Sequence, residues 1–282
     1  MPTLAEKLAE AESILGASDV ADARRDARLL VAAAIRRDRT FLIAHPEYQL
    51  QPAEVELVDA LVRRRSANEP FQYIAGETEF YGLDFIVTPD VLIPRPETEI
   101  LVENAIDILG ALPSASLCEV GIGSGCIAVS ILHHVPDTTA TGLDVSQEAL
   151  AVAQSNARRH NLAARLELRE SDVFSALNEE RFELIVSNPP YIPLLDLDGL
   201  QAEVRDFEPH LALFAGADGL SVIRSIVAEA PRFMTSGGYL LMEIGFGQSE
   251  AVAAMFDPRA WRSVEVLPDL QAIPRLVKAR LR

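Results

Sequence analysis

The sequence predicts an α/β fold in which helices cover both faces of a mostly parallel sheet, preceded by a small all-helical domain. From Ser116 onward, apolar strand-like runs alternate with helix-like runs, and this alternation is typical of parallel sheets with helices on both faces. Before residue 75, apolar residues recur only at helical spacing. We therefore expect a helical domain at 1–75, a linker at 76–93 and an α/β domain at 94–282.

The first domain is predicted to hold helices at 4–16, 22–35 and 52–65, where apolar residues recur at helical spacing. The stretch Asn68-Glu69-Pro70 ends the last of them. Arginines gather at 36–39 and 63–65, although a cluster of this kind is often a solvated helix face. Since no catalytic set of residues occurs here, we interpret the domain as a substrate-recognition module.

The linker is predicted to form a β-hairpin. Residues 79–87 are rich in aromatic and β-branched residues, and Gly82 is a turn signal among them. The prolines of Pro94-Arg95-Pro96 then favour an extended segment. An apolar-periodic helix follows at 100–109.

The α/β elements follow in order along the chain. The predicted strands lie at 117–120, 140–144, 166–168, 182–187 and 239–244, and the predicted helices lie at 127–134, 147–160, 222–230 and 249–256. Ligands of open α/β sheets bind in the crevice outside the carboxyl ends of the strands. The residues directly after each strand are therefore the candidates for function.

Composition excludes several classes of protein. The 282 residues are 49% apolar, which excludes wholesale disorder. The net charge is −17, and since residues 1–75 hold ten basic and twelve acidic residues, the remaining 207 carry 15 basic and 30 acidic ones. An acidic surface of this kind argues against a non-specific grip on nucleic acid. No signal peptide or membrane-length apolar stretch is visible, so we expect a soluble, cytoplasmic protein.

The residue pattern assigns no metal. The two cysteines, Cys118 and Cys126, do not form a CxxC pair, so neither a zinc site nor a disulfide framework follows from them. The neighbouring His133 and His134 end an apolar helix, and adjacent helical residues point in different directions.

The most informative residues are Asn188-Pro189-Pro190-Tyr191, directly after the strand at 182–187. Asn188 offers a side-chain carbonyl and Pro189 a backbone carbonyl. Two converging acceptors match the two hydrogens of a planar –NH2 group, and the Tyr191 ring can lie against such a group. We interpret this loop as a receptor for an amino group on an sp2 carbon, although Asn-Pro also opens ordinary turns.

A glycine-rich loop follows the first strand of the sheet. Gly121, Gly123 and Gly125 stand at alternate positions before a helix, where glycine allows close approach of a ligand and the helix N-terminus favours negative charge. Asp144 ends the next strand, where an acid binds ribose hydroxyls. The run 123–128 also satisfies the dinucleotide pattern G-x-G-x-x-A, so hydride transfer stays open on this loop alone. The –NH2 receptor favours methyl transfer.

With these motifs the sequence resembles the class I S-adenosylmethionine-dependent methyltransferases, which have a Rossmann-like, mostly parallel seven-stranded sheet. Within them it resembles, over nearly its full length, the HemK/PrmC protein-glutamine methyltransferases that modify peptide chain release factors. The segment 93–99, Ile-Pro-Arg-Pro-Glu-Thr-Glu, is typical of this subfamily, and 206–209 and Glu243-Ile244 also fit.

The resemblance implies S-adenosylmethionine as cofactor, S-adenosylhomocysteine as product, and N5 methylation of the glutamine in the Gly-Gly-Gln motif of release factors. It implies Asn188, Pro189 and Tyr191 as catalytic residues and the whole loop 188–191 as the substrate site. The implied cofactor residues are Glu119, Gly121, Ile122, Gly123, Ser124, Gly125, Asp144, Asp172, Val173 and Asn188. Two of them depart from the usual pattern: Glu119 stands where Asp is commoner, and Val173 replaces a bulkier residue.

Three alternatives remain from the sequence. A DNA adenine methyltransferase also presents an –NH2 receptor, but it normally needs a basic reading surface. A glutamine methyltransferase of a ribosomal protein shares the chemistry, and the 95–99 run favours release factors over it. A binding module could keep the cofactor fold without turnover.

Overall fold

The computed structural model describes residues 1–18 and 20–282, which form two compact units. The first holds residues 1–77 together with 201–207, and the second holds residues 78–200 and 208–282. The short segment 201–207 therefore packs with the N-terminal helices, although it interrupts the α/β part of the sequence. The division at residues 75 and 93 stays a prediction.

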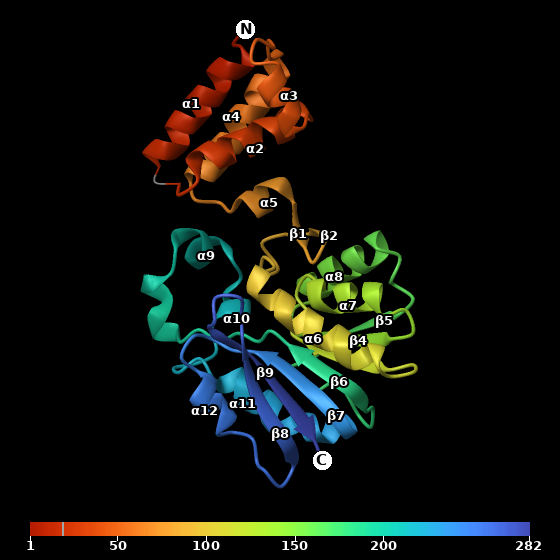
Figure 1. The fold of residues 1–282 in the computed structure, drawn as a ribbon. Coiled ribbons are helices and arrows are strands. Elements are labelled where there is room, and N and C mark those ends of the chain that lie inside the picture. The colour runs from red at the N-terminus through yellow and green to blue at the C-terminus, as the bar shows by residue number, and fades with distance from the viewer. Residues whose placement is uncertain (19) are drawn as a thin grey trace. The chain divides into compact units, whose positions relative to one another are not determined.

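The first unit is all-helical, as expected (Figure 1). Its helices are α1 (Leu4–Ala17), α2 (Ala23–Ile35), α3 (Arg39–Ala44), α4 (Pro52–Ser66), α5 (Phe71–Ala75) and, from the distant segment, α9 (Ala202–Phe207). A capping box begins α1, where Thr3 Oγ1 accepts from the Glu6 amide and the Thr3 amide donates to Glu6. Helices α3, α5 and α9 were not predicted from the sequence, because five or six residues show too little periodicity to reveal a helix.

A buried arginine connects the segments of this unit. Arg65 Nε donates to Asp26 Oδ2 at 2.7 Å, and its other nitrogens donate to Glu203 and to the Glu69 backbone carbonyl. Arg65 is 4% exposed and Asp26 8% exposed. Part of the arginine run that looked like a solvated face is therefore an interior ion pair joining α2, α4 and α9.

Within the described residues, the second unit holds a seven-stranded sheet in the order β5-β4-β3-β6-β7-β9-β8. Its strands are β3 (Ser116–Val120), β4 (Thr139–Asp144), β5 (Leu166–Glu170), β6 (Phe182–Ser187), β7 (Met234–Glu243), β8 (Trp261–Pro268) and β9 (Pro274–Leu281). In the order of the sheet, β5, β4, β3, β6 and β7 pair in parallel. Strand β9 pairs antiparallel with both of its neighbours, β7 and β8. The predicted fold class, a mostly parallel seven-stranded sheet, is confirmed.

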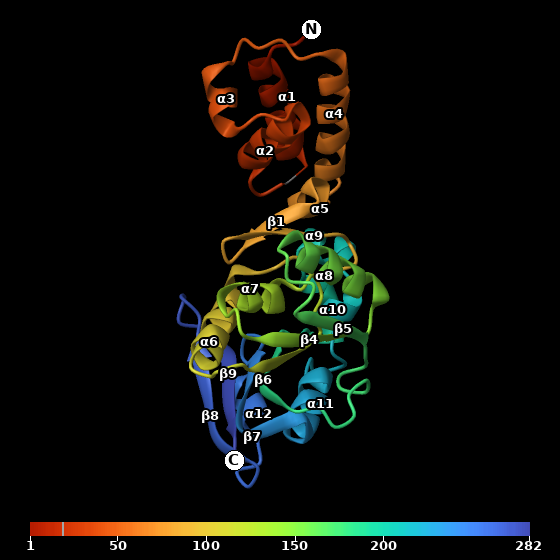
Figure 2. The same cartoon turned by 90° about the vertical axis from the view of Figure 1, so that its right-hand side faces the viewer.

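Helices cover both faces of this sheet (Figure 2). The helices of this unit are α6 (Glu99–Gly110), α7 (Cys126–His134), α8 (Gln147–Arg159), α10 (His210–Leu213), α11 (Ser221–Glu229) and α12 (Ser249–Ala253). One core joins α6, α7 and α8 to one set of strand residues, which includes Leu184 and Val186. The other joins α11 and α12 to the alternate set, which includes Ile185. This alternation is the period of two that a strand with two buried faces requires.

The predicted hairpin is present as β1 (Glu77–Phe80) and β2 (Leu83–Ile86). Buried Asn156 of α8 joins it to the glycine loop: its Oδ1 accepts from the Ile86 amide at 2.7 Å, and its Nδ2 donates to the Ile86 and Ser124 carbonyls at 2.9 Å. An alanine at 156 would remove the side-chain partner of all three backbone groups.

Strands β8 and β9 were not predicted from the sequence. In β8 the charged Arg262 and Glu265 interrupt the apolar residues, and much of the strand is exposed, so its apolar signal is weak. The helices of the described residues include none with the length and hydrophobicity that crossing a membrane requires.

Candidate active site

The residues singled out from the sequence lie along one edge of the sheet. Val120 pairs with Leu143 of β4 on one side and with Ser187 of β6 on the other. Ser187 in turn pairs with Met242 of β7. Because these strands are parallel, the loops after β4, β3 and β6 and the end of β7 emerge side by side, as the topology of an α/β sheet requires.

The glycine loop after β3 has a backbone shape that only glycine adopts readily. Gly121, Gly123 and Gly125 have φ angles of +73°, +53° and +78°. A Cβ at Gly121 or Gly123 would meet nothing within 4 Å, whereas one at Gly125 would press on Ala153 at 3.3 Å. The first two glycines therefore leave open space beside the backbone, and the third allows α7 and α8 to pack. Ile122 and Ser124 between them are buried.

Asp144 holds this loop from the end of β4. Its Oδ2 accepts from the Gly123 amide at 2.8 Å and its Oδ1 from the Ser146 amide at 3.0 Å. The carboxylate is half-buried, and each oxygen keeps further acceptor capacity. Asp144 is therefore oriented before any ligand arrives.

Glu119 lies behind the loop and does not reach the surface. It is 1% exposed, and its Oε2 accepts from the Ala128 amide in the first turn of α7 at 2.8 Å. Burial raises the pKa of its carboxyl well above the ordinary value, and the charge of Asp144 adds to this effect.

Asp172 and Val173 follow β5, on the far side of β4 from the glycine loop. Asp172 is exposed. Val173 has a φ of +49°, which is rare for a β-branched residue, and its carbonyl accepts from Ser171 Oγ at 3.0 Å. Strained backbone of this kind clusters at ligand sites.

A chain of hydrogen bonds orients Asn188 at the end of β6. Its Nδ2 donates to Thr98 Oγ1 at 3.2 Å, and the Thr98 hydroxyl donates to Glu243 Oε2 at 2.6 Å. The hydroxyl of Tyr191 donates to the other oxygen of Glu243 at 3.3 Å. With its nitrogen turned to Thr98, the amide of Asn188 leaves its Oδ1 as an acceptor for a ligand.

The Glu243 carboxylate at the centre of this chain is almost wholly buried, at 3% exposure. Burial raises its pKa, while the bond from Thr98 and the charge of Arg275 act in the opposite direction. Burial also raises the pKa of Tyr191, so its hydroxyl stays a donor.

The backbone of Tyr191 is held from two sides. Its carbonyl accepts from Gln248 Nε2 at 2.9 Å, and Gln248 Oε1 accepts from the Gly245 amide at 2.9 Å. On the other side a Cβ at Gly219 would stand 2.2 Å from the same carbonyl oxygen. The loop 188–191 is therefore a fixed structure, in which Pro189 is buried and Pro190 half-buried.

Comparison with known proteins places this architecture in a family. The PrmC N-terminal domain model matches residues 6–76, and the methyltransferase small domain model matches residues 97–198. A release factor glutamine methyltransferase of Geobacter sulfurreducens is 44% identical over 95% of this chain and 93% of its own. Another, of Cereibacter sphaeroides, is 44% identical over 98% of both chains.

The chain belongs to the release factor glutamine methyltransferase family. The solved structure of a methyltransferase from Pyrococcus furiosus superposes with a TM-score of 0.52 at 17% identity, covering 72% of this chain and 90% of that one. This likeness shows the methyltransferase fold alone.

The structure adds site residues of this methyltransferase that sequence reasoning did not assign. Thr98 was noted only as part of the 93–99 motif, and Gln248 was not noted. Arg95 of the same motif forms an ion pair with buried Glu208. Glu99 Oε1 accepts from the Tyr81 amide at 3.0 Å, so Glu99 connects the hairpin to α6. In the sequence, Thr98 could be found through its place in the 93–99 motif. Gln248 lies in none of the motifs described above.

Proposed function

We propose that this chain transfers the methyl group of S-adenosylmethionine to the side-chain amide nitrogen of the glutamine in the Gly-Gly-Gln motif of peptide chain release factors. The observation that carries the proposal is the orientation of Asn188. Its amide nitrogen is engaged by Thr98, so its carbonyl oxygen is the group offered beside the glycine loop. A carbonyl acceptor suits the N–H of a substrate amide.

The proposed cofactor site lies at the carboxyl ends of the neighbouring strands β5, β4, β3 and β6. Family membership implies S-adenosylmethionine, and the open space at Gly121 and Gly123 fits a ligand lying against the backbone. In this proposal Asp144 accepts from the ribose hydroxyls, and Asp172 and Val173 border the adenine. The remaining cofactor residues are Ile122, Ser124, Gly125, Asn188 and Glu119, with Glu119 acting from behind by fixing the start of α7.

The proposed substrate site is the loop 188–191. Asn188 Oδ1 and the Pro189 carbonyl accept the two hydrogens of the glutamine –NH2, and Tyr191 packs against the amide plane with Pro190 shaping the turn. The buried Glu243 holds both Thr98 and Tyr191, so the receptor is preorganised.

An amide nitrogen is a weak nucleophile, because its lone pair is delocalised into the carbonyl. S-adenosylmethionine supplies an already activated methyl group, so the work left to the protein is orientation and electrostatic stabilisation. The two carbonyl acceptors of the loop polarise the substrate nitrogen and direct it toward the methyl group. The nitrogen becomes acidic as the new bond forms, so a water molecule suffices to take the proton.

The helical unit is proposed as the part that positions the body of the release factor. Remote contacts can place a reactive side chain that a free peptide presents poorly. We further propose a cytoplasmic protein without direct nucleic-acid binding, which agrees with the net charge of −17.

The test is transfer of a radiolabelled methyl group from S-adenosylmethionine to purified intact release factor. Label is expected on wild-type release factor and not on one whose Gly-Gly-Gln glutamine is replaced by alanine. Purified ribosomal proteins and adenine-containing duplex DNA are the competing substrates. Preferential labelling of either would replace this proposal with the corresponding alternative, and no labelling of any substrate would favour a binding module.

A further inference from the structure

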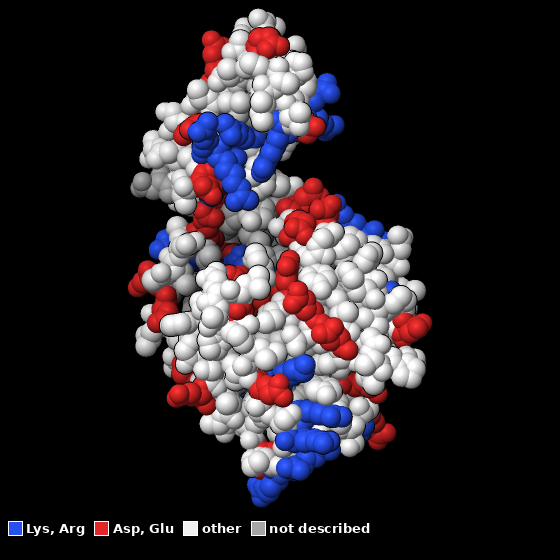
Figure 3. All heavy atoms as spheres, viewed as in Figure 1, with Lys and Arg blue, Asp and Glu red and all other residues white. Residues whose placement is uncertain are grey.

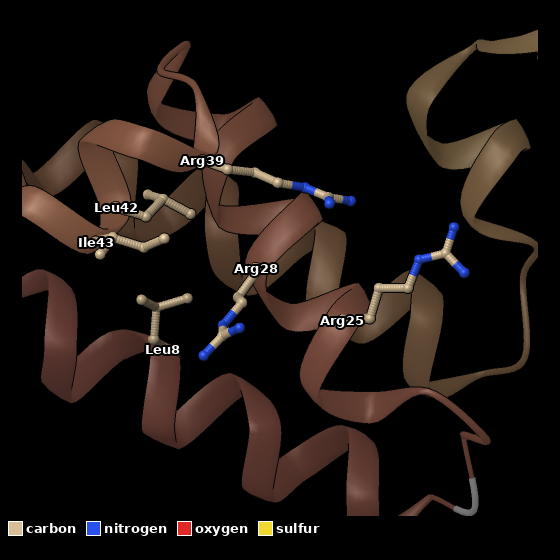
Figure 4. Close-up of a pocket in the computed structure, with 6 residues that line it drawn as sticks. All are labelled: Leu8, Arg25, Arg28, Arg39, Leu42 and Ile43. Carbon is tan, nitrogen blue, oxygen red and sulfur yellow. The ribbon is translucent and has the colours of Figure 1, made fainter.

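The helical unit carries a hollow that the reaction does not use. Its volume is about 340 Å³, and it is lined by Leu8, Arg25, Arg28, Arg39, Leu42 and Ile43. Figure 4 shows Leu8 of α1 pointing toward Leu42 and Ile43 of α3, with Arg28 of α2 beside Leu8. This size lies at the lower end of the range for ligand pockets, about 300–1,000 Å³, and suits one or two side chains of a partner.

The apolar part of the hollow is open to solvent. Ile43 is 78% exposed, whereas Leu42 beside it is 5% exposed and belongs to the core of the unit. An aliphatic residue here extends the core outward to a surface that a partner can cover. Covering such a side chain is favourable, because it removes apolar surface from water.

The rim of the hollow is cationic and largely uncompensated. Among residues 1–18 and 20–282, Arg28 and Arg39 have no ion pair, and Arg25 lies 3.7 Å from Asp22 with both side chains mostly exposed. In the same unit, by contrast, Arg64 and Arg65 are paired with carboxylates. Figure 3 shows the Lys and Arg side chains gathered on this face of the unit. Guanidinium groups bind carboxylates in a bidentate manner, so the rim selects an acidic partner.

The combination of an apolar hollow and an arginine rim favours a protein partner over a nucleic acid. A phosphate backbone would satisfy the arginines but would leave Leu8 and Ile43 uncovered. A helix or loop with one aliphatic or aromatic side chain between carboxylates satisfies both parts of the hollow. Interfaces of this kind place an apolar anchor in a pocket and charges around it.

We infer that this hollow is the docking site for an acidic segment of the protein substrate that carries one apolar anchor residue, away from the methylated glutamine. The inference rests on the proposed function, since it takes the release factor as the partner. It adds the place of contact and the chemistry of the segment that binds there.

The test measures affinity separately from turnover, using the full-length chain. The variants are the double substitution Arg28→Glu/Arg39→Glu and the single substitution Ile43→Ser. The matched control is Arg63→Glu, which reverses the charge of an exposed arginine of α4 that does not line the hollow. Calorimetry gives the Kd for intact release factor, and kinetics compare that substrate with a short Gly-Gly-Gln peptide.

The double variant is expected to raise Kd and KM for intact release factor at least tenfold, with kcat and the peptide reaction within twofold of wild type. Ile43→Ser is expected to raise Kd severalfold, and Arg63→Glu to leave it unchanged. An unchanged Kd in the double variant, or an equal rise in Arg63→Glu, overturns the docking site. So does a double variant that loses affinity for a 20-nucleotide single-stranded RNA but keeps its affinity for release factor. A wild-type chain that binds release factor through these arginines yet methylates neither substrate contradicts only the proposed reaction.

Discussion

Asn188 and Thr98 are 90 residues apart in the sequence, and the amide nitrogen of the first donates to the hydroxyl oxygen of the second at 3.2 Å. The Thr98 hydroxyl in turn donates a hydrogen bond to Glu243, which is 145 residues after Thr98 in the sequence. The bond decides which end of the Asn188 amide faces the sheet edge. A threonine that never touches the substrate in our proposal thus sets the polarity of the receptor.

Thr98→Val is expected to lower kcat about 10- to 100-fold, which corresponds to roughly 1.4–2.8 kcal/mol, and to change the Kd for S-adenosylmethionine much less than this. Valine keeps the shape of the side chain but cannot bond Asn188 or Glu243, so the amide is free to turn. Steady-state kinetics and calorimetry measure the two quantities. Thr98→Ser restores the hydroxyl and should recover most of kcat; a fully active valine variant would remove Thr98 from the mechanism.

Asp144→Ala is expected to weaken S-adenosylmethionine binding by about 1.5–3 kcal/mol, the range for hydrogen bonds to a charged group. The substitution also releases the Gly123 amide that the carboxylate holds, which adds to the loss. Calorimetry measures the affinity, and Asp137→Ala removes the same charge at an exposed turn as a control. Equal affinities in the two variants would contradict the assignment, and binding of NAD in place of S-adenosylmethionine would revive hydride transfer.

Gly219→Ala is expected to lower both stability and activity. The residue has a φ of +72°, and a Cβ there would meet the Tyr191 carbonyl oxygen at 2.2 Å, so the backbone of the 188–191 loop must shift. Strain and overpacking of this kind cost about 1–3 kcal/mol, measured by denaturant unfolding. At Gly199, a Cβ would meet nothing within 4 Å, so Gly199→Ala is the control. Equal behaviour of the two alanine variants would show that the loop does not depend on this close approach.

Glu119→Gln is expected to flatten the pH dependence of the free energy of unfolding. Burial raises the pKa of Glu119 in the folded chain well above its ordinary value of 4.5, so the folded state binds this proton more tightly than the unfolded state. Stability from this group therefore falls as pH rises from about 4.5 through the folded pKa. Glutamine keeps an acceptor for the Ala128 amide without a charge.

Urea unfolding between pH 5 and 8 tests this expectation. The slope of stability against pH should be smaller in Glu119→Gln than in wild type, and the difference between the two proteins should grow with pH in favour of the variant. Parallel curves would mean that Glu119 titrates alike in the folded and unfolded states.

The sequence by itself determined the architecture and the placing of the candidate site. Local patterns sufficed for this: period-two apolar runs indicate strands with two buried faces, and a parallel sheet brings the residues after each strand to one edge. Asp144 and the 188–191 loop could be predicted to lie at the same edge of the sheet, because Asp144 ends one strand and the loop directly follows another. The two C-terminal strands could not be located, since charged residues interrupt the apolar pattern of both β8 and β9.

Only the tertiary structure decided how the site is held. Asn188 depends on Thr98, the Tyr191 carbonyl on Gln248 57 residues away, and the glycine loop on Asn156. The same holds for Arg65, whose charge suggested a solvated surface until Asp26 and Glu203 were seen around it. The sequence shows which groups a polar side chain can donate or accept with, but it does not show the partner, because a hydrogen bond requires two atoms within about 3 Å. For residues this far apart along the chain, only the packing of sheet and helices brings them that close.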